Sequence, residues 1–210
     1  MVTREELHAA LVQRHGEVVQ QRLDRACVGI AGLGGLGSHI AAHMARLGVG
    51  RLTLVDYDVV DITNLNRQYY TVKDIGIPKT LALQEQLEAI NPYLYYDTYT
   101  ERIVPANAAR LFTGCDVVCE AFDRADQKAM LIETLLSALP DTPVVSASGM
   151  AGYGSPNAIR TERRFGHLYV CGDGTSDIAD GLGLMAPRVV LCAAHQATTA
   201  LRLLLGETEQ

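Results

Sequence analysis

Apolar residues recur along the first part of the chain with a spacing that switches between strand and helix. An apolar run at 27–31 is followed by helical spacing over 38–47 and then by a β-rich run at 51–56. One helix between two strands is the spacing of a βαβ unit, whose right-handed crossover makes the two strands parallel neighbours. The pattern therefore predicts the start of a parallel sheet.

The same alternation continues to the end of the chain. Apolar spacing, with prolines at helix ends, predicts helices over 78–91, 105–112 and 126–139 and strands over 93–99, 116–121 and 144–147. Residues 5–24 have a helical spacing interrupted near Gly16, which predicts a helical lead-in. Two β-like runs, 157–161 and 167–171, bracket 163–166 like a hairpin, and 187–205 is apolar nearly all round, which predicts a buried closing helix. These elements predict an α/β fold with a doubly wound, mostly parallel sheet, a C-terminal β-hairpin and a closing helix.

Composition narrows the class of protein without changing this picture. The 210 residues suit one domain, and an apolar content of 48% is ample for its core. A net charge of -6 without a Lys/Arg run argues against an electrostatically driven binder of nucleic acid or membranes. No apolar window reaches the roughly 18 residues of a spanning helix, and the first residues lack the apolar stretch of a signal peptide. We therefore expect a cytoplasmic protein without a membrane partner.

The segment Gly32-Leu33-Gly34-Gly35-Leu36-Gly37 fits the pattern G-x-G-x-x-G and lies between a predicted strand and a predicted helix. Glycines let the backbone turn tightly and approach phosphates, and the N-terminus of a helix favours negative charge. Asp56 ends the next strand, where a carboxylate can accept hydrogen bonds from ribose hydroxyls. The combination predicts a Rossmann-like nucleotide-binding domain; the alternative is a tight turn without a ligand.

Residues 57–77 form a long polar stretch where a compact α/β fold usually has a connection of about 2–6 residues. Asn64 and Arg67 share a face if this stretch makes a helical turn, and Lys79 enters at the start of the next helix. Two cations and an amide would then converge where a triphosphate extends from the glycines, and would stabilise a phosphoryl-transfer transition state. The alternative is a solvated polar loop.

Asp123 follows the fourth predicted strand. Ligands of open parallel sheets bind outside the carboxyl ends of the strands, so the glycines, Asp56 and Asp123 should lie on one rim. Asp123 could hold Mg²⁺ together with phosphate oxygens. It could equally be the N-cap of the helix that begins near Asp126.

Together these motifs resemble the ThiF/MoeB/E1-like activating-enzyme superfamily over nearly the whole chain. The resemblance is carried by the glycine motif, Asp56-Tyr57-Asp58, Asn64-Leu65-Asn66-Arg67-Gln68, Gly76-Ile77-Pro78-Lys79 and Asp123. It implies that Asp56 binds the ribose of ATP, that Asn64, Arg67 and Lys79 bind its phosphates, and that Asp123 binds Mg²⁺. The short length and the sequence Gly149-Met150-Ala151-Gly152-Tyr153-Gly154 resemble the ThiF-type branch associated with thiamine biosynthesis.

Members of this superfamily adenylate the C-terminal Gly-Gly carboxylate of a small ubiquitin-fold carrier such as ThiS or MoaD and release pyrophosphate. A carboxylate is already ionised at neutral pH, so the reaction needs no general base, in agreement with a site of cations and metal. The resemblance implies an ATP-dependent adenylyltransferase acting on a ThiS-like carrier. Residues 1–25 would be the lead-in, 26–150 the nucleotide-binding core, and 151–210 the part that binds the carrier and a second subunit.

Three features of the family, a zinc site, an arginine from a partner subunit and a reactive cysteine, are absent from this sequence or have only candidate residues. Many relatives bind zinc through two C-x-x-C pairs, whereas this chain has five widely spread cysteines, so we expect no structural zinc. The family also implies an arginine supplied by the partner of a homodimer, for which Arg14 is the first candidate and Arg4 the second; an ordinary surface arginine is the alternative. Cys171 precedes a Gly- and Asp-rich stretch and is the candidate reactive thiol, although nearby acids would raise its pKa.

Other functions stay open from the sequence alone. Within the superfamily, the acceptor could be a MoaD-like carrier or a carboxylate attached to tRNA. Outside it, the glycine motif also suits an NAD-dependent oxidoreductase or a non-catalytic nucleotide-binding scaffold. The chain left after the nucleotide rim is short for a separate substrate domain, which argues against the oxidoreductase and for a protein partner.

Overall fold

A computed structural model describes residues 2–207 and contains one seven-stranded sheet with the strand order β3-β2-β1-β4-β5-β7-β6. Neighbouring strands are parallel except β6, which is antiparallel to β7. The strand order reverses beside β1, which pairs with both β2 and β4, so the crevice at the end of β1 is a topological switch point. The strands are β1 Cys27–Ala31, β2 Arg51–Val55, β3 Tyr95–Tyr99, β4 Val117–Glu120, β5 Val144–Ala147, β6 Arg160–Phe165 and β7 Leu168–Gly172.

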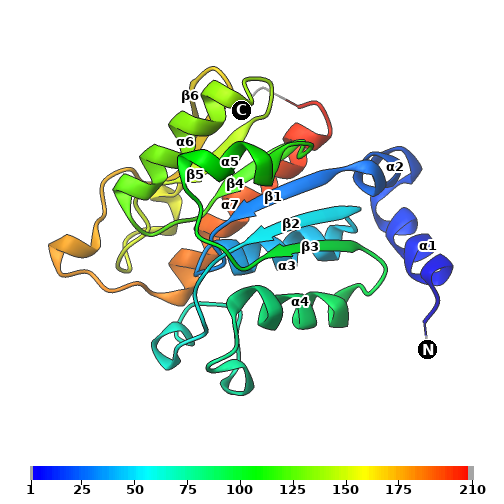
Figure 1. Cartoon of the computed structure of the whole chain (residues 1–210), viewed down its shortest axis with the longest axis horizontal. Helices are drawn as coiled ribbons and strands as arrows, with labels where there is room; N and C mark the ends of the chain where they lie inside the picture. The colour runs from blue at the N-terminus through cyan, green and yellow to red at the C-terminus, as the bar shows by residue number, and fades with distance from the viewer. Residues whose placement is uncertain (1, 208–210) are drawn as a thin grey trace.

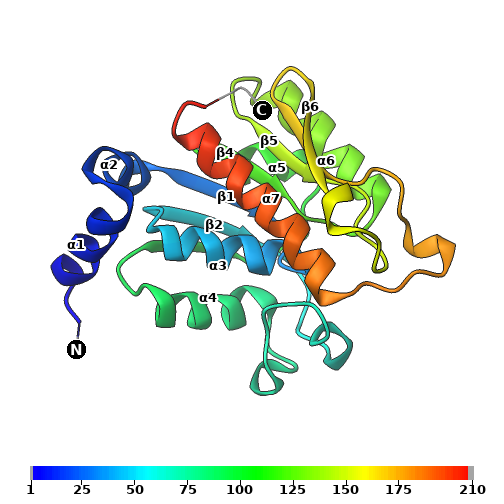
Figure 2. The same cartoon turned by 180° about the vertical axis from the view of Figure 1, so that it is seen from behind.

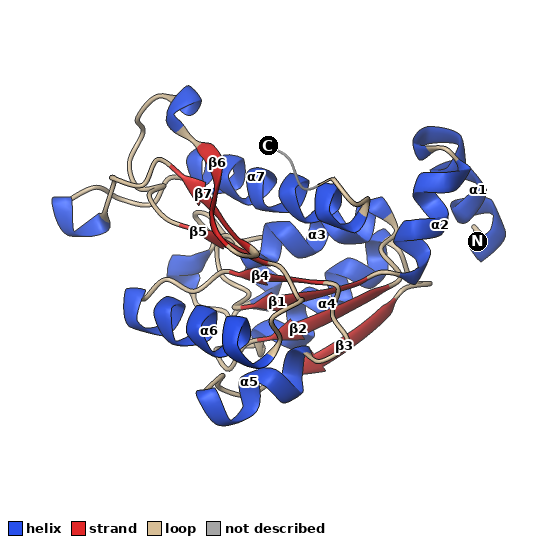
Figure 3. Ribbon diagram, turned by 90° about the horizontal axis from the view of Figure 1, so that it is seen from above, coloured by secondary structure: helices blue, strands red, loops and turns tan. Residues whose placement is uncertain are grey.

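Helices cover both faces of the sheet, as Figure 3 shows from above. Helices α3, α4 and α7 lie on one face and α5 and α6 on the other, whereas α1 and α2 lie beyond the end at which β1 begins (Figures 1 and 2). None of the helices within residues 2–207 is long and apolar enough to cross a membrane. The helices are α1 Arg4–His15, α2 Glu17–Arg25, α3 Gly37–Leu47, α4 Lys79–Ile90, α5 Pro105–Phe112, α6 Ala125–Ala138 and α7 Ala186–Leu204.

Local sequence explains where several of these helices begin and end. Thr3 and Glu6 form a capping box at the start of α1, and proline stands in the first turn of α5 and of α7. Helix α3 stops at Gly48, whose φ of 74° is left-handed and therefore suits glycine. The α/β class and the order of elements predicted from the sequence are confirmed, and most boundaries agree within a few residues.

Two predicted details are wrong. The hairpin is confirmed, and its second strand, predicted at 167–171, is β7 Leu168–Gly172; the first strand, predicted at 157–161, is wrong, because β6 is Arg160–Phe165 and the turn lies at Gly166 and His167. The reason is that β6 is an edge strand, where Arg163 and Arg164 stay exposed without desolvation, so a charged sequence can be a strand there. Helix α7 is also not buried all round, because one side of it faces solvent at positions such as Thr198.

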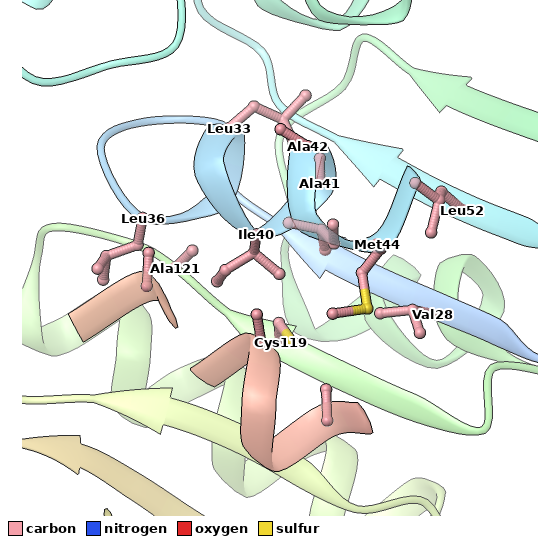
Figure 4. Close-up of a cluster of buried hydrophobic side chains, with 14 of the residues drawn as sticks. Val28, Leu33, Leu36, Ile40, Ala41, Ala42, Met44, Leu52, Cys119 and Ala121 are labelled. Atoms are coloured by element: carbon pink, nitrogen blue, oxygen red, sulfur yellow. The ribbon is translucent and has the colours of Figure 1, made fainter. Parts of the chain in front are cut away.

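The core lies between β1 and the helices on either face. All five residues of β1 are buried, as expected for a central parallel strand. In Figure 4, Ile40 and Met44 of α3 point toward Val28 of β1 and Cys119 of β4. Three alanines of the same helix, Ala41, Ala42 and Ala45, are also buried in this core.

Ile40→Ala should lower the free energy of unfolding by about 2–5 kcal/mol, because it leaves a cavity beneath α3. Urea unfolding monitored by circular dichroism measures the difference. Val18→Ala is the matched control, since Val18 is 68% exposed, and its effect should stay within about 0.5 kcal/mol. Equal effects of the two substitutions would contradict this account of the core.

Candidate functional site

A pocket with a volume of about 280 Å³ lies at the carboxyl ends of the strands. The glycine segment after β1, Asp56 after β2 and Asp123 after β4 all line it, together with Arg67 and Lys79. Five separate parts of the sequence thus meet at the rim that the topology predicts for a ligand.

The glycine segment forms a turn that requires glycine at positions 32 and 37. Gly32 has a φ of 88° and packs against the backbone of Ala121, and a Cβ on Gly37 would lie 1.8 Å from the carbonyl oxygen of Gly32. Helix α3 then begins without a side-chain cap, and Ser38 N–H already donates to Gly34 O, so the backbone N–H groups that could meet an anion are those of the glycine turn before it. The turn therefore presents backbone donors to the pocket at close range.

Asp56 ties this turn to β2. Its two carboxylate oxygens accept hydrogen bonds from the backbone N–H groups of Leu33 (2.7 Å) and Asp58 (2.8 Å). Burial raises the pKa of Asp56, and the charge of Lys79 together with the two backbone N–H groups opposes that rise. Asp56 thus shapes the glycine turn as well as offering lone pairs to a ligand.

The polar stretch 57–77 is an ordered excursion rather than a loose loop. It contains two short 3₁₀ helices, Ile62–Asn64 and Val72–Asp74, and it is closed at its base by the hydrogen bond from Val60 N–H to Ile77 O. The Tyr70 hydroxyl donates to Leu33 O (2.8 Å), and Tyr69 N–H donates to the Ser38 hydroxyl (3.0 Å). These bonds hold the excursion against the glycine turn and α3.

Asn64 and Arg67 do belong to one helical turn, since Arg67 N–H donates to Asn64 O. Their side chains nevertheless do different things. The Asn64 side chain accepts from Asp61 N–H (3.0 Å) and caps the 3₁₀ helix, and Asn64 is not among the residues that line the pocket. Arg67 lines the pocket beside Gly35, with its guanidinium near Thr63 O and Asn66.

Lys79 begins α4 with only 6% of its surface exposed. Its Nζ lies 2.9 Å from Oδ2 of Asp58, whose side chain is half exposed. A buried ammonium is stable only with such a partner. The pair keeps the positive charge at the pocket wall, from which it can also reach a phosphate oxygen.

Asp123 is exposed on the rim and is not the N-cap of the following helix, because α6 starts at Ala125 with Arg124 in the cap position. The preceding turn is held by Glu120, which is fully buried. Glu120 accepts from Phe122 N–H (2.7 Å), Lys128 Nζ (2.9 and 3.0 Å) and the Ser146 hydroxyl. This network fixes the backbone that carries Asp123.

Sequence reasoning missed part of the pocket. Gln68 is 8% exposed and lines it, and its Oε1 is buried without a hydrogen-bond partner. The motif Asn-Leu-Asn-Arg-Gln contained this residue, but its amide was given no role. Another part of the pocket wall, Ser148–Ala151 and Ser176–Ile178, was given no role in nucleotide binding, because no spacing in the sequence connects these segments to the glycines.

Two predicted residues lie elsewhere. Arg14 is exposed on α1, at the opposite end of the sheet from the pocket (Figure 1), so one chain does not bring it to its own site. Cys171 is fully buried in β7 and does not line the pocket. Burial raises the pKa of the Cys171 thiol, opposed by hydrogen bonds with Thr161 and Thr199, so the position does not suit a reactive thiolate.

A model of the ThiF family matches residues 6–210. The chain belongs to the ThiF family. The sulfur carrier protein adenylyltransferase of Thermus thermophilus is 37% identical over 126 residues, which are 58% of this chain and 46% of that protein. The adenylyltransferase and sulfurtransferase UBA4 of Yarrowia lipolytica is 30% identical over 184 residues, which are 84% of this chain and 45% of that protein.

A third relative of this ThiF-family chain is the tRNA threonylcarbamoyladenosine dehydratase of Escherichia coli, 32% identical over 148 residues, or 70% of this chain and 54% of the relative. The chain thus spans about half the length of the curated relatives it matches. A crystal structure of the E. coli dehydratase TcdA in complex with ATP superimposes with a TM-score of 0.86 over 99% of this chain and 98% of that one. At 22% sequence identity this likeness confirms the Rossmann-like α/β fold.

Asp56→Asn should change how stability depends on pH. Because the pKa of Asp56 is raised above its ordinary value of about 4, the native state binds more protons than the unfolded state between the two pKa values, and wild type loses stability as pH rises through that window. Asparagine does not ionise, so the unfolding free energy of the variant minus that of wild type should become more positive from about pH 4 to 7. Urea unfolding across this range measures it; a flat difference would contradict the raised pKa.

Proposed function

We propose that the protein is an ATP-dependent adenylyltransferase that activates a carboxylate as an acyl adenylate and releases pyrophosphate. The observation that carries the proposal is the convergence of the glycine turn, Asp56, Arg67, Lys79 and Asp123 on one pocket. The names of the relatives support the activity, and the ATP complex of the structural neighbour supports nucleotide binding.

In this site the glycine turn before α3 receives phosphates, and Asp56 accepts the ribose hydroxyls. Arg67 and Lys79 stabilise the charge that moves onto the leaving pyrophosphate. The acceptor carboxylate attacks the α-phosphorus as an anion, so the chain needs to supply orientation and positive charge rather than a base.

Residues 2–207 contain no cluster of three His, Cys, Asp or Glu side chains that could hold a metal ion by themselves. Asp123 nevertheless fits the ion that accompanies ATP, because Mg²⁺ commonly takes one or two carboxylates and completes its shell with phosphate oxygens and water. Asp123 is exposed on the pocket rim, where such an ion would meet it. The bound Mg²⁺ would neutralise phosphate charge.

For the acceptor we propose the C-terminal Gly-Gly of a small ubiquitin-fold sulfur carrier of the ThiS type, acting in thiamine biosynthesis. Relatives named for sulfur carrier adenylation support the carrier. The tRNA-attached carboxylate is the second candidate, favoured by the similarity to the tRNA-modifying dehydratase over nearly the whole chain. Exchange of pyrophosphate into ATP, assayed with each acceptor, separates the two.

Asp123→Ala should reduce pyrophosphate–ATP exchange at least about 100-fold, because the Mg²⁺ that stabilises the charge of the transition state loses a carboxylate ligand. Its melting temperature should stay within a few degrees of wild type, since Asp123 is exposed. Asp126→Ala is the matched control, because Asp126 is an exposed carboxylate three residues later that pairs with Arg124, and it should retain wild-type exchange. Wild-type turnover in Asp123→Ala would exclude the metal role.

We further propose a homodimer in which Arg14 of one subunit completes the site of the other, since α1 lies far from its own pocket (Figure 2). Arg14→Ala and Asp123→Ala should each be inactive alone. Mixed and refolded in equal amounts, they should recover about a quarter of wild-type exchange, because half of the dimers are heterodimers with one intact site. No recovery, with dimers present by light scattering, would rule out Arg14 acting across subunits.

A further inference from the structure

One wall of the pocket consists of two segments that are joined to each other. We call residues 148–155 the wall loop and residues 173–184 the strap. The strap begins with Asp173 N–H donating to Gly149 O (2.9 Å) and Gly174 N–H donating to Ser148 O (3.1 Å). It ends with Gly152 N–H donating to Gly183 O (2.7 Å) and with Asn66 Nδ2 donating to Leu184 O (3.0 Å).

The strap is therefore anchored at both ends, while its middle is exposed; Ile178 retains 58% of its surface. Figure 1 shows it as the orange segment projecting at the end of the molecule opposite α1. Ser176, Asp177 and Ile178 line the pocket from the strap, and Ser148–Ala151 line it from the wall loop.

A buried arginine holds the first anchor. Arg188, in the first turn of α7, is 6% exposed and forms an ion pair with Asp173. A second guanidinium nitrogen, Nη1, donates to Gly154 O (2.8 Å) and Ser155 O (2.9 Å). One side chain thus joins α7, the wall loop and the strap, and the rigid planar guanidinium fixes the directions of these bonds better than a flexible lysine would.

Asp173 is built for the same task. Its Oδ1 accepts the backbone N–H groups of Thr175 and Ser176, each at 2.9 Å, and its Oδ2 takes Arg188. Burial alone would raise the pKa of Asp173, but these hydrogen bonds outweigh it and hold the pKa at about 2. Asp173 packs closely against Gly149, because a Cβ on Gly149 would lie 2.1 Å from Asp173 Oδ1.

We propose that Arg188 and Asp173 are positioning residues that fix the strap as the surface along which the acceptor carboxylate reaches the nucleotide. The inference rests on the proposed function for its acceptor. The glycine turn, Asp56 and Lys79 line the part of the pocket that we assign to the nucleotide, and we assign the part lined by the strap and the wall loop to the acceptor. Arg188 does not line the pocket and acts through that wall.

The test compares Arg188→Met, Arg188→Lys and Asp173→Asn with Arg164→Met, a control on an exposed arginine of β6. The first readout is the rate of thermolysin cleavage within residues 173–184, located by mass spectrometry. We expect cleavage of Arg188→Met to rise about ten-fold, Arg188→Lys and Asp173→Asn to lie in between, and the control to match wild type. Unchanged strap cleavage in all three variants would overturn the proposal.

The second readout separates positioning from general damage. With a purified ubiquitin-fold protein ending in Gly-Gly as acceptor, the KM for that acceptor should rise about ten-fold in Arg188→Met, while the Kd for ATP by calorimetry stays within about two-fold. A Kd for ATP that weakens in step with the acceptor KM would overturn the positioning role. If Arg188→Met fails to fold, the two conservative variants decide by the same criteria.

The readouts also distinguish failure of this inference from failure of the proposed function. Wild type that binds ATP but exchanges no pyrophosphate with the carrier or with a tRNA carboxylate contradicts adenylyl transfer, and with it the acceptor part of this inference. Strap cleavage does not depend on any acceptor and still decides whether Arg188 holds the strap.

Discussion

The site depends on one close approach, the return of the chain at Gly37 over the carbonyl of Gly32. A single Cβ at Gly37 would collide with that oxygen at 1.8 Å, so α3 can start directly above the end of β1 only because the residue is glycine. Gly32 N–H donates to Val55 O at the end of β2, and Gly32 packs on Ala121 after β4. The turn therefore sets the relative positions of the ends of β1, β2 and β4. The positions of Asp56 and Asp123, which follow β2 and β4, depend on it.

Charge in and around this pocket is organised in pairs. Lys79 with Asp58, Lys128 with Glu120 and Arg188 with Asp173 each combine a buried or partly buried cation with a carboxylate. An unpaired charge in such positions would cost several kcal/mol. The pairs differ in what they can do: Asp58 is half exposed and leaves Lys79 able to meet a phosphate, whereas Glu120 and Arg188 also bond to backbone groups and hold that backbone in place.

The family relationship and the pocket geometry support the same assignment for the part of the site proposed to bind the nucleotide. They constrain the part proposed to bind the acceptor less. The glycine turn and the excursion after β2 are bound together by Tyr69, Tyr70 and His39, whose Nε2 lies 3.0 Å from Arg67 O. The strap and the wall loop are instead held by the ion pair between Arg188 and Asp173, at either end of the segment that connects β7 to α7. Two parts of the pocket wall are thus held by separate sets of contacts.

The sequence by itself determined the class and order of the elements, because periods of 2 and 3.6 residues and the positions of glycine and proline are local properties. It also placed the glycines, Asp56, Lys79 and Asp123 on one rim, since parallel strands end at the same edge. The sequence did not predict the register of the hairpin, because the edge strand β6 is charged and is defined by its pairing with β7.

Only the tertiary structure decided what each side chain does. It turned Asn64 into a cap, buried Cys171, brought Gln68 into the pocket and set Arg188 against Asp173 across 15 residues of chain. These outcomes depend on contacts between segments that no local spacing encodes. A buried polar residue needs a hydrogen-bond partner, and the packing of the chain determines which partner it has.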